Sequence, residues 1–232
     1  MSILAIDTSM TACSAALLRV GAREAIQRHE PMTRGHAEAI FPMIEAVMAE
    51  AACGYEDLEK IAVTLGPGSF TGVRAGVAAA RGLALAAKRP VVGVGSFEVM
   101  AHGACRQLST DPRKGGFAVV HDARRGEVYT QQFDADGGVL SEPRALSVED
   151  ALGALGGEIT LVLGSGAQML SEAVRARGRD LRADLPGLLP EARDLAHIAL
   201  IAAITDRAPA PLYLRPPDAK PQTDKSVARV DA

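Results

Sequence analysis

The sequence predicts an α/β protein made of two similar halves. Short apolar segments typical of strands alternate with longer segments whose apolar residues recur at helical spacing, which favours sheets with crossover helices. Each half opens with two such strands around a polar turn, at 3–6 and 14–18 and again at 117–120 and 127–129. The 232 residues also exceed the roughly 100–150 of a common single domain. We therefore expect two related α/β subdomains.

The first subdomain is expected over residues 1–100. Apolar residues that recur every three or four positions predict its first helix, and Pro90 ends the second. The expected order is strand 3–6, strand 14–18, helix 33–51, strand 61–65, helix 71–87 and strand 91–94.

The second subdomain is expected over residues 101–189. After its opening hairpin the sequence predicts a strand at 160–163 and a helix at 167–177. A last helix, at 190–205, is apolar nearly all round and should be deeply packed. Residues 207–232 are proline-rich and predict an extension that is flexible at its end.

Composition and charge exclude several classes of protein. Hydrophobic residues make up 48% and charged residues 23% of the chain, which is ordinary for a protein with a packed core. A net charge of −3 and only 3% aromatic residues argue against independent binding of tRNA or DNA. Three scattered cysteines do not form a disulfide framework, and neither a signal peptide nor a membrane span is visible. We expect a cytoplasmic protein without membrane contact.

Two loops carry residue types that suit a phosphate or a metal. Asp7, Thr8 and Ser9 occupy the turn of the first hairpin, where a carboxylate and two hydroxyls lie together. The same residue types also form ordinary Asx and ST turns. Gly164 and Gly166 belong to a Gly-Ser-Gly turn between a strand and a helix, which can face a nucleotide across a cleft.

The segment GPGSFTGVR, at 66–74, places a glycine-rich turn before a helix. A helix N-terminus can bind an anion, but the segment matches neither the Walker pattern nor GxGxxG, which favours a structural turn. In the helix that follows, Gly72, Gly76, Ala80 and Ala84 form a stripe of small residues. Such a stripe fits packing within the domain and also fits contact with a helix of another chain.

The histidines show no catalytic pattern. None of the five lies four residues from another, and neither HExxH nor GxSxG occurs. The sequence therefore shows no machinery of a metalloprotease or a serine hydrolase.

Several segments, in order along almost the whole chain, resemble the TsaB (YeaZ) family. They are ILAIDTS with ACSAAL, GPGSFTGVRAG with ARGLA, PVVGVGSFE, DARRGEVY and LYLR, and the GPGSFTGVR segment is highly specific. The resemblance implies an actin-like ATPase (ASKHA, ribonuclease H-like) fold in which helix 190–206 packs back on the first subdomain. It also implies a role in bacterial synthesis of threonylcarbamoyladenosine beside the tRNA anticodon.

The resemblance further implies a subunit that supports catalysis by others. Its partners would be a homologous catalytic subunit, TsaD, and an ATPase, TsaE, and tRNA would be bound only through the complex. The catalytic relative carries a metal-binding HxxGH motif, and Ser96 and Met100 stand at the positions of its histidines. Neither is a good ligand for a hard or borderline metal ion. We expect no catalytic residue, no metal and no tightly bound cofactor, and at most weak binding of adenine nucleotide at Asp7, Thr8, Ser9, Gly164 and Gly166.

The resemblance places the partner surface on the helices at 35–51 and 71–87, which would form a four-helix bundle with a second chain. The predicted contact residues are Ile40, Ile44, Val47, Gly72, Gly76 and Ala80. The same surface predicts a homodimer when the partner is absent. Gly76→Leu is expected to abolish partner binding and to leave the monomer folded.

Two alternatives belong to other classes. One is an independent ATPase or small-molecule kinase on the same fold, which would use Asp7 and the Gly-Ser-Gly turn and would turn over ATP unaided. The other is a glycoprotease-like peptidase, which would contain metal and lose activity on chelation. Fold alone does not assign chemistry.

Overall fold

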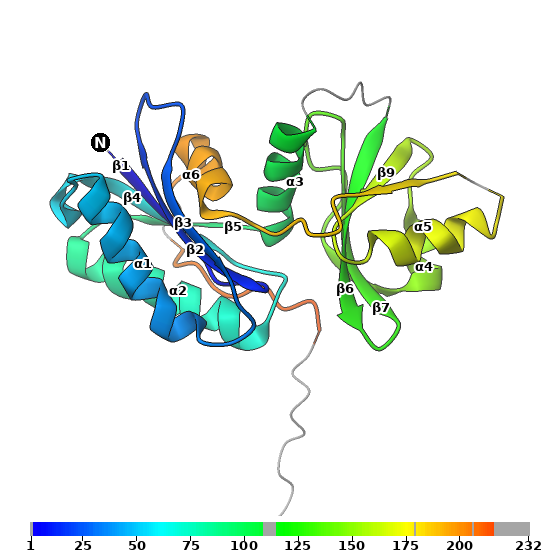
Figure 1. The fold of residues 1–232 in the computed structure, drawn as a ribbon, viewed down its shortest axis with the longest axis horizontal. Helices are drawn as coiled ribbons and strands as arrows, with labels where there is room; N and C mark the ends of the chain where they lie inside the picture. The colour runs from blue at the N-terminus through cyan, green and yellow to red at the C-terminus, as the bar shows by residue number, and fades with distance from the viewer. Residues whose placement is uncertain (1, 109–114, 179, 206, 216–232) are drawn as a thin grey trace, which may run out of the picture.

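The computed structural model describes residues 2–108, 115–178, 180–205 and 207–215. It contains two five-stranded sheets side by side, each with helices (Figure 1). The first sheet has the order β3-β2-β1-β4-β5 and the second β10-β9-β6-β7-β8. The strands of the first are β1 (Ser2–Asp7), β2 (Ala12–Arg19), β3 (Ile26–Pro31), β4 (Leu58–Thr64) and β5 (Val91–Val94). Those of the second are β6 (Gly116–Arg124), β7 (Glu127–Phe133), β8 (Arg144–Ser147), β9 (Ile159–Leu163) and β10 (Arg182–Asp184).

The two sheets have the same topology. In the first, β1 pairs antiparallel with β2 and parallel with β4. In the second, β6 pairs antiparallel with β7 and parallel with β9. The outer strands continue the match, because β3 and β8 are antiparallel to their neighbours and β5 and β10 are parallel to theirs. This repetition confirms the predicted α/β fold with two related subdomains.

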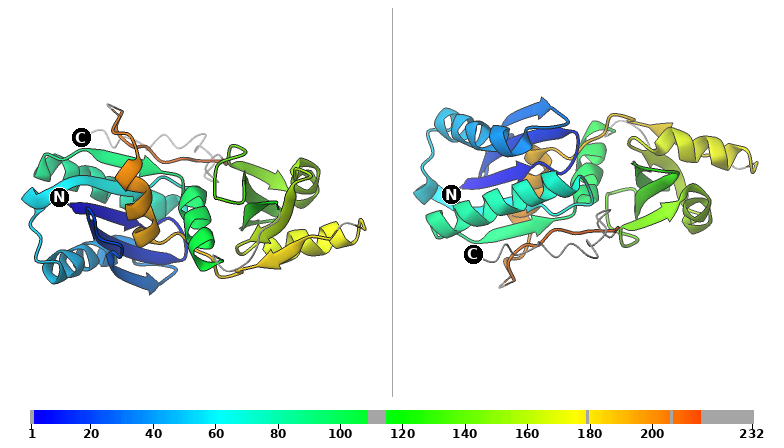
Figure 2. Two further views of the ribbon diagram at one scale, coloured as in Figure 1. Left: turned by 90° about the horizontal axis from the view of Figure 1, so that it is seen from above. Right: turned by 90° about the horizontal axis from the view of Figure 1, so that it is seen from below.

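Helices cover both faces of the first sheet (Figures 1 and 2). On one face α1 (His36–Glu50) and α2 (Phe70–Ala87) enclose an apolar core with the side chains of β1, β2 and β4. On the other face lies α6 (Ala192–Ile201), which packs on β1 and β2 with Leu195 fully buried. The late helix therefore does return to the first subdomain, as the resemblance implied.

The helix α3 (Ser96–Gln107) joins the subdomains. Its Val99 belongs to the core beneath α6, whereas Phe97, Met100 and Ala104 pack on the inner face of the second sheet. The opposite face of that sheet is covered by α4 (Val148–Ala154) and α5 (Ala167–Arg175). The boundary expected near residue 100 thus falls inside a helix that is shared by both cores.

The strands that sequence reasoning missed are β3, β8 and β10, and all three lie at sheet edges. Edge strands are half-exposed and show little apolar alternation, as in β3, whose only strongly apolar residue is Ile26. The helices α3 and α4 and the short 3₁₀ turn at Tyr55–Asp57 were also not predicted.

The last helix is shorter and less buried than predicted. It begins at Ala192, after Pro190, and it ends at Ile201, where the ammonium of Lys60 donates to the carbonyls of Ala199 (2.8 Å) and Ala202 (3.3 Å). Ile201 is 91% exposed, so the expectation of deep packing all round was wrong. Residues 207–215 pack on the protein, and the rest of the predicted extension lies outside the described residues. Among the helices described, none has the length and apolar character required to cross a membrane.

Candidate functional site

The last residue of β1, Asp7, carries a buried carboxylate. Asp7 Oδ1 accepts hydrogen bonds from the hydroxyls of Thr64 (2.5 Å) and Ser9 (2.7 Å). Its other oxygen, Oδ2, is buried and has no hydrogen-bond partner among the described residues. Burial raises the pKa of Asp7, and the hydrogen bonds from Thr64 and Ser9 offset part of that effect. The environment therefore favours a neutral carboxyl more than an ordinary aspartate site does.

The chain itself covers the turn after β1. The hydroxyl of Thr8 donates to the carbonyl of Gly72 (2.7 Å), and the amide of Ser69 donates to the carbonyl of Ser9 (2.7 Å). The side chains of Asp7, Thr8 and Ser9 are at most 1% exposed. They lie together as predicted, but the start of α2 occupies the space from which a ligand would approach them.

The second predicted loop is shaped by packing on β6. Gly164 has a φ of +99°, and a Cβ on Gly166 would lie 2.8 Å from Val120 Cγ1. Ser165 between them is exposed. Its hydroxyl accepts from the amide of Asp122 (3.1 Å) and lies 3.0 Å from His121 Nδ1. Burial lowers the pKa of His121, which favours the neutral imidazole as an acceptor for the Ser165 hydroxyl.

An open cavity of about 260 Å³ separates the two subdomains beside Ser165. Thr11 contributes to it from the first hairpin, and His121, Asp122 and Arg124 contribute from the second. The structure therefore brings Thr11, rather than Asp7, opposite the Gly-Ser-Gly turn. The polar turn of the second hairpin was visible in the sequence, but no pattern indicated that it would meet the first hairpin across a cavity.

The positions of the relative's metal-binding histidines are used for packing. Ser96 begins α3, and its hydroxyl donates to that of Ser9 (3.0 Å). Met100, one turn later, lies in the core between α3 and the second sheet. Both side chains are fully buried. In the part of the chain that the structure describes, no group of three or more His, Cys, Asp or Glu side chains is placed to hold a metal ion.

The residues predicted to contact a partner lie inside the subunit. All six are buried: Ile40, Ile44, Val47, Gly72, Gly76 and Ala80. The apolar face of α1 packs on its own sheet, because an amphipathic helix directs that face to the core. These six residues are therefore corrected from contact residues to core residues.

The small residues of α2 allow the helix to approach β1. A Cβ on Gly72 would lie 2.1 Å from the carbonyl oxygen of Thr8, and one on Gly76 would lie 2.5 Å from the Thr8 hydroxyl oxygen. A leucine at Gly76 would have to displace the Thr8 hydroxyl or α2 itself. Gly76→Leu is therefore expected to disturb the core as well as any surface, and it does not isolate partner binding.

The opposite sides of α1 and α2 are exposed together. We call this surface the outer α1–α2 face; it comprises Ala37, Phe41 and Glu45 of α1 and Arg74, Ala78, Gly82 and Leu85 of α2. Phe41 is 45% exposed and Leu85 is 83% exposed. A Cβ on Gly82 would meet no atom of the described part of the chain within 4 Å. If these two helices meet another chain, this is the face that they present.

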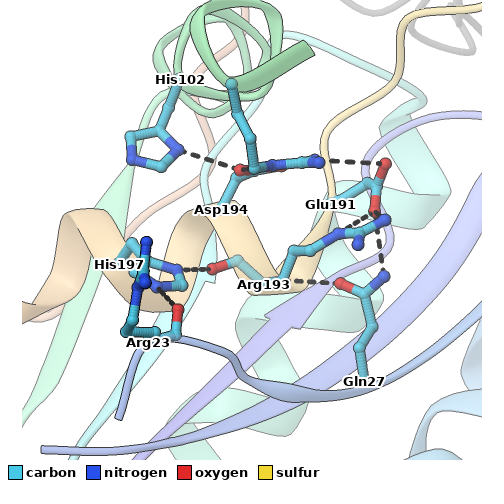
Figure 3. Close-up of polar contacts among 8 residues, drawn as sticks. Arg23, Gln27, His102, Glu191, Arg193, Asp194 and His197 are labelled. Atoms are coloured by element: carbon cyan, nitrogen blue, oxygen red, sulfur yellow. Dashed lines mark hydrogen bonds and ion pairs between the residues drawn. The ribbon is translucent and has the colours of Figure 1, made fainter. Parts of the chain in front are cut away.

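A buried carboxylate ties α6 to the connecting helix α3 (Figure 3). The carboxylate of Asp194, in α6, accepts hydrogen bonds from two nitrogens of Arg106, Nε (3.1 Å) and a terminal nitrogen (3.0 Å). It is also hydrogen-bonded to His102 Nδ1 (2.9 Å). Burial acts to raise the pKa of Asp194, but the hydrogen bonds and charges of His102 and Arg106 outweigh it and hold that pKa below its ordinary value. Glu191, at the start of α6, bonds Gln27 of β3 (3.0 Å), so β3, α3 and α6 are linked.

Comparisons with known proteins agree with one another. Residues 29–174 match the family model described as "TsaD: tRNA N6-adenosine threonylcarbamoyltransferase". The chain is 37% identical to the tRNA threonylcarbamoyladenosine biosynthesis protein TsaB of Escherichia coli K12, with 86% of each chain covered. It is also similar to the structure of YeaZ from Pseudomonas aeruginosa, with a TM-score of 0.77, 30% identity, and coverage of 92% of this chain and 99% of that one.

The chain also matches a threonylcarbamoyltransferase, from Erythrobacter litoralis, at 33% identity, but over 59% of this chain and only 38% of the enzyme. The TsaB and YeaZ matches instead cover most of both chains, and the YeaZ structure has the same fold. The protein therefore belongs to the TsaB (YeaZ) family, within the wider family of tRNA N6-adenosine threonylcarbamoyltransferases.

Proposed function

We propose that this protein is a non-catalytic scaffold subunit in the bacterial synthesis of threonylcarbamoyladenosine on tRNA. It binds a TsaD-like catalytic subunit and a TsaE-like ATPase, and it reaches tRNA only through that complex. Its membership of the TsaB family supports the pathway. The observation that carries the non-catalytic role is the use of Ser96 and Met100, at the positions of the relative's histidines, as fully buried packing residues.

The outer α1–α2 face is the proposed docking surface for the catalytic subunit. On α2 the small exposed residues Ala78 and Gly82 lie between Arg74 and Leu85, so a partner helix can approach the backbone between these two larger side chains. Phe41 adds an exposed ring from the neighbouring helix. Aromatic and arginine side chains are enriched among the residues that dominate binding energy. The same face serves for the homodimer that forms when the partner is absent.

Ala78→Arg should weaken binding of the catalytic subunit by at least about thirtyfold, or about 2 kcal/mol, because it puts a long charged side chain into a close helix contact. The substitution is at an exposed helical position, so the fold should be unaffected. Ala176→Arg, at an exposed position beside α5, is the matched control. Affinity would be measured by titration with the purified catalytic subunit. If Ala78→Arg binds the catalytic subunit with unchanged affinity, the outer α1–α2 face is not the docking surface.

Weak binding of an adenine nucleotide is the second function that an observation favours. The cavity between Thr11 and Ser165 has polar groups from both subdomains and is open to solvent. A nucleotide there would contact Ser165 and Thr11, since Asp7, Thr8 and Ser9 are covered. Gly164 and Gly166 would contribute by positioning the loop.

Ser165→Asp should abolish any such binding, because a carboxylate beside a nucleotide phosphate is repelled. Isothermal titration with ATP and Mg²⁺, followed by a turnover assay of the isolated chain, provides the measurement. Equal affinity in Ser165→Asp would exclude this cavity, and steady ATP turnover by the wild-type chain alone would favour an independent ATPase over a scaffold.

A further inference from the structure

The segment that follows α6 crosses from the first subdomain to the second. Figure 2 shows it, in orange, running along the outside of the first subdomain toward the second in both views. On the first subdomain, the amide of Leu212 donates to the carbonyl of Leu65, just after β4 (2.7 Å). The ring of Tyr213 packs on Phe70 at the start of α2, with the ring centroids 4.9 Å apart. The guanidinium of Arg74 lies over the same Phe70 ring, 4.2 Å from its centroid.

Two residues later the same segment binds the second subdomain. The guanidinium of Arg215 forms an ion pair with Glu127, the first residue of β7. It also donates to the carbonyl of Ala123 (3.4 Å) and lies 5.7 Å from the ring centroid of Tyr129. Within four residues, Leu212 to Arg215, the chain is therefore anchored on both subdomains.

Before its first anchor the segment borders a cavity. The cavity, of about 370 Å³, lies between residues 207–212 and Leu65, Val91 and Gly93, at the end of β4 and in β5. Pro209 is buried in this stretch, and the polar and ring contacts that attach the segment follow at Leu212, Tyr213 and Arg215. Each anchor is partly exposed, and partly exposed ion pairs and ring contacts are individually weak.

We propose that residues 212–215 form a clasp that restricts rotation of the two subdomains about α3. Two other connections join the subdomains: α3 itself and the segment from β10 to α6. Rotation about a shared helix is a common form of domain motion, and a third connection at a distance from that helix opposes it. Release of the clasp lets the cavity between Thr11 and Ser165 widen or close. The clasp is a property of the isolated chain and holds whether or not the proposed docking surface is correct.

The test measures the distance between subdomains. Spin labels at Val20→Cys and Met169→Cys, both exposed, report on the first and second subdomain in a background with the native cysteines replaced. Dilution with unlabelled protein removes distances between molecules. If the clasp holds, the label-to-label distance should have one narrow distribution in the labelled protein without further substitutions. The distribution should become broader after Arg215→Glu or Glu127→Arg. The double variant Arg215→Glu, Glu127→Arg should narrow it again, because the ion pair is restored with its charges exchanged.

Hydrogen exchange of the Leu212 amide gives an independent readout. It should become about tenfold faster in Arg215→Glu, which corresponds to the loss of about 1.4 kcal/mol in attachment. Tyr213→Ala should act in the same way, whereas Tyr213→Phe keeps the ring and should not. Circular dichroism verifies that each variant is folded. The clasp would be overturned if the distance distribution stayed narrow in folded Arg215→Glu. It would also be overturned if the distribution were as broad in the double variant as in the two single variants.

Discussion

Gly72→Ala should destabilise the protein by about 3 kcal/mol or leave it insoluble, because overpacking typically costs about 1–3 kcal/mol and the obstacle here is backbone. The added Cβ would lie 2.1 Å from the carbonyl oxygen of Thr8. That carbonyl belongs to the turn that the start of α2 covers, so relief requires moving the helix or the turn. The effect should appear as a lower midpoint of urea unfolding with little change in slope.

Gly82→Ala provides the matched control on the same helix. Within the ranges that the structure describes, its Cβ would meet no atom within 4 Å, so only the intrinsic preference of alanine for helix should act. We expect stabilisation of about 0.5–1 kcal/mol. The two substitutions are chemically identical and differ only in the side of α2 on which they lie. Equal effects of the same sign would contradict the assignment of the small-residue stripe to the core.

Asp194→Ala should be the second most damaging change, with a cost of about 2–3 kcal/mol in the free energy of unfolding. It removes the buried acceptor of His102 and Arg106, and hydrogen bonds to charged groups contribute about 1.5–3 kcal/mol. His102 and Arg106 are each 40% exposed, so water can partly replace the lost carboxylate and limit the cost. Glu149→Ala, which breaks the exposed pair with Arg177, is the control and should cost no more than about 0.5 kcal/mol.

The contribution of Asp194 should also depend on pH. Its folded-state pKa is depressed, so its stabilisation is fully present above the unfolded value of about 3.8 and is lost as pH falls through the folded pKa. The difference in unfolding free energy between the wild type and Asp194→Asn should therefore shrink below about pH 4. A difference that grows on acidification would show that the carboxylate is not held in its charged form by His102 and Arg106.

Much of the fold could be predicted because its central strands and long helices have strong patterns. Three of the predicted strands, β1, β2 and β4, are central in the first sheet, and β5 is bounded by Pro90 and Gly95. The helices α1 and α2 are amphipathic over 15 and 18 residues. β3, β8 and β10 could not be predicted because an edge strand buries too little to require apolar alternation. The connecting helix α3 was not predicted, although Glu98, His102 and Arg106 mark a narrow polar side, because its apolar residues serve two cores and do not recur as a single stripe.

The candidate site was predicted less well, and the reason is geometric. Sequence spacing showed that Gly72 and Gly76 lie on one side of α2, but not whether that side meets the sheet or another chain. Likewise, Asp7, Thr8 and Ser9 have the residue types of a phosphate loop, and only the position of Gly72 and Ser69 over them shows that the turn is covered. Both ambiguities concern which surface faces inward, which depends on contacts far apart in the sequence.

In the proposed role this chain supports a partner through the outer α1–α2 face and performs no chemistry itself. That role can be tested by reconstitution of threonylcarbamoyladenosine synthesis on tRNA, with the catalytic subunit and ATPase held constant and this chain omitted, added, or added as Ala78→Arg or Ala176→Arg. We expect strong stimulation by the wild type and by Ala176→Arg, and loss of stimulation with folded Ala78→Arg. Full activity without this chain, or full stimulation by Ala78→Arg, would contradict it.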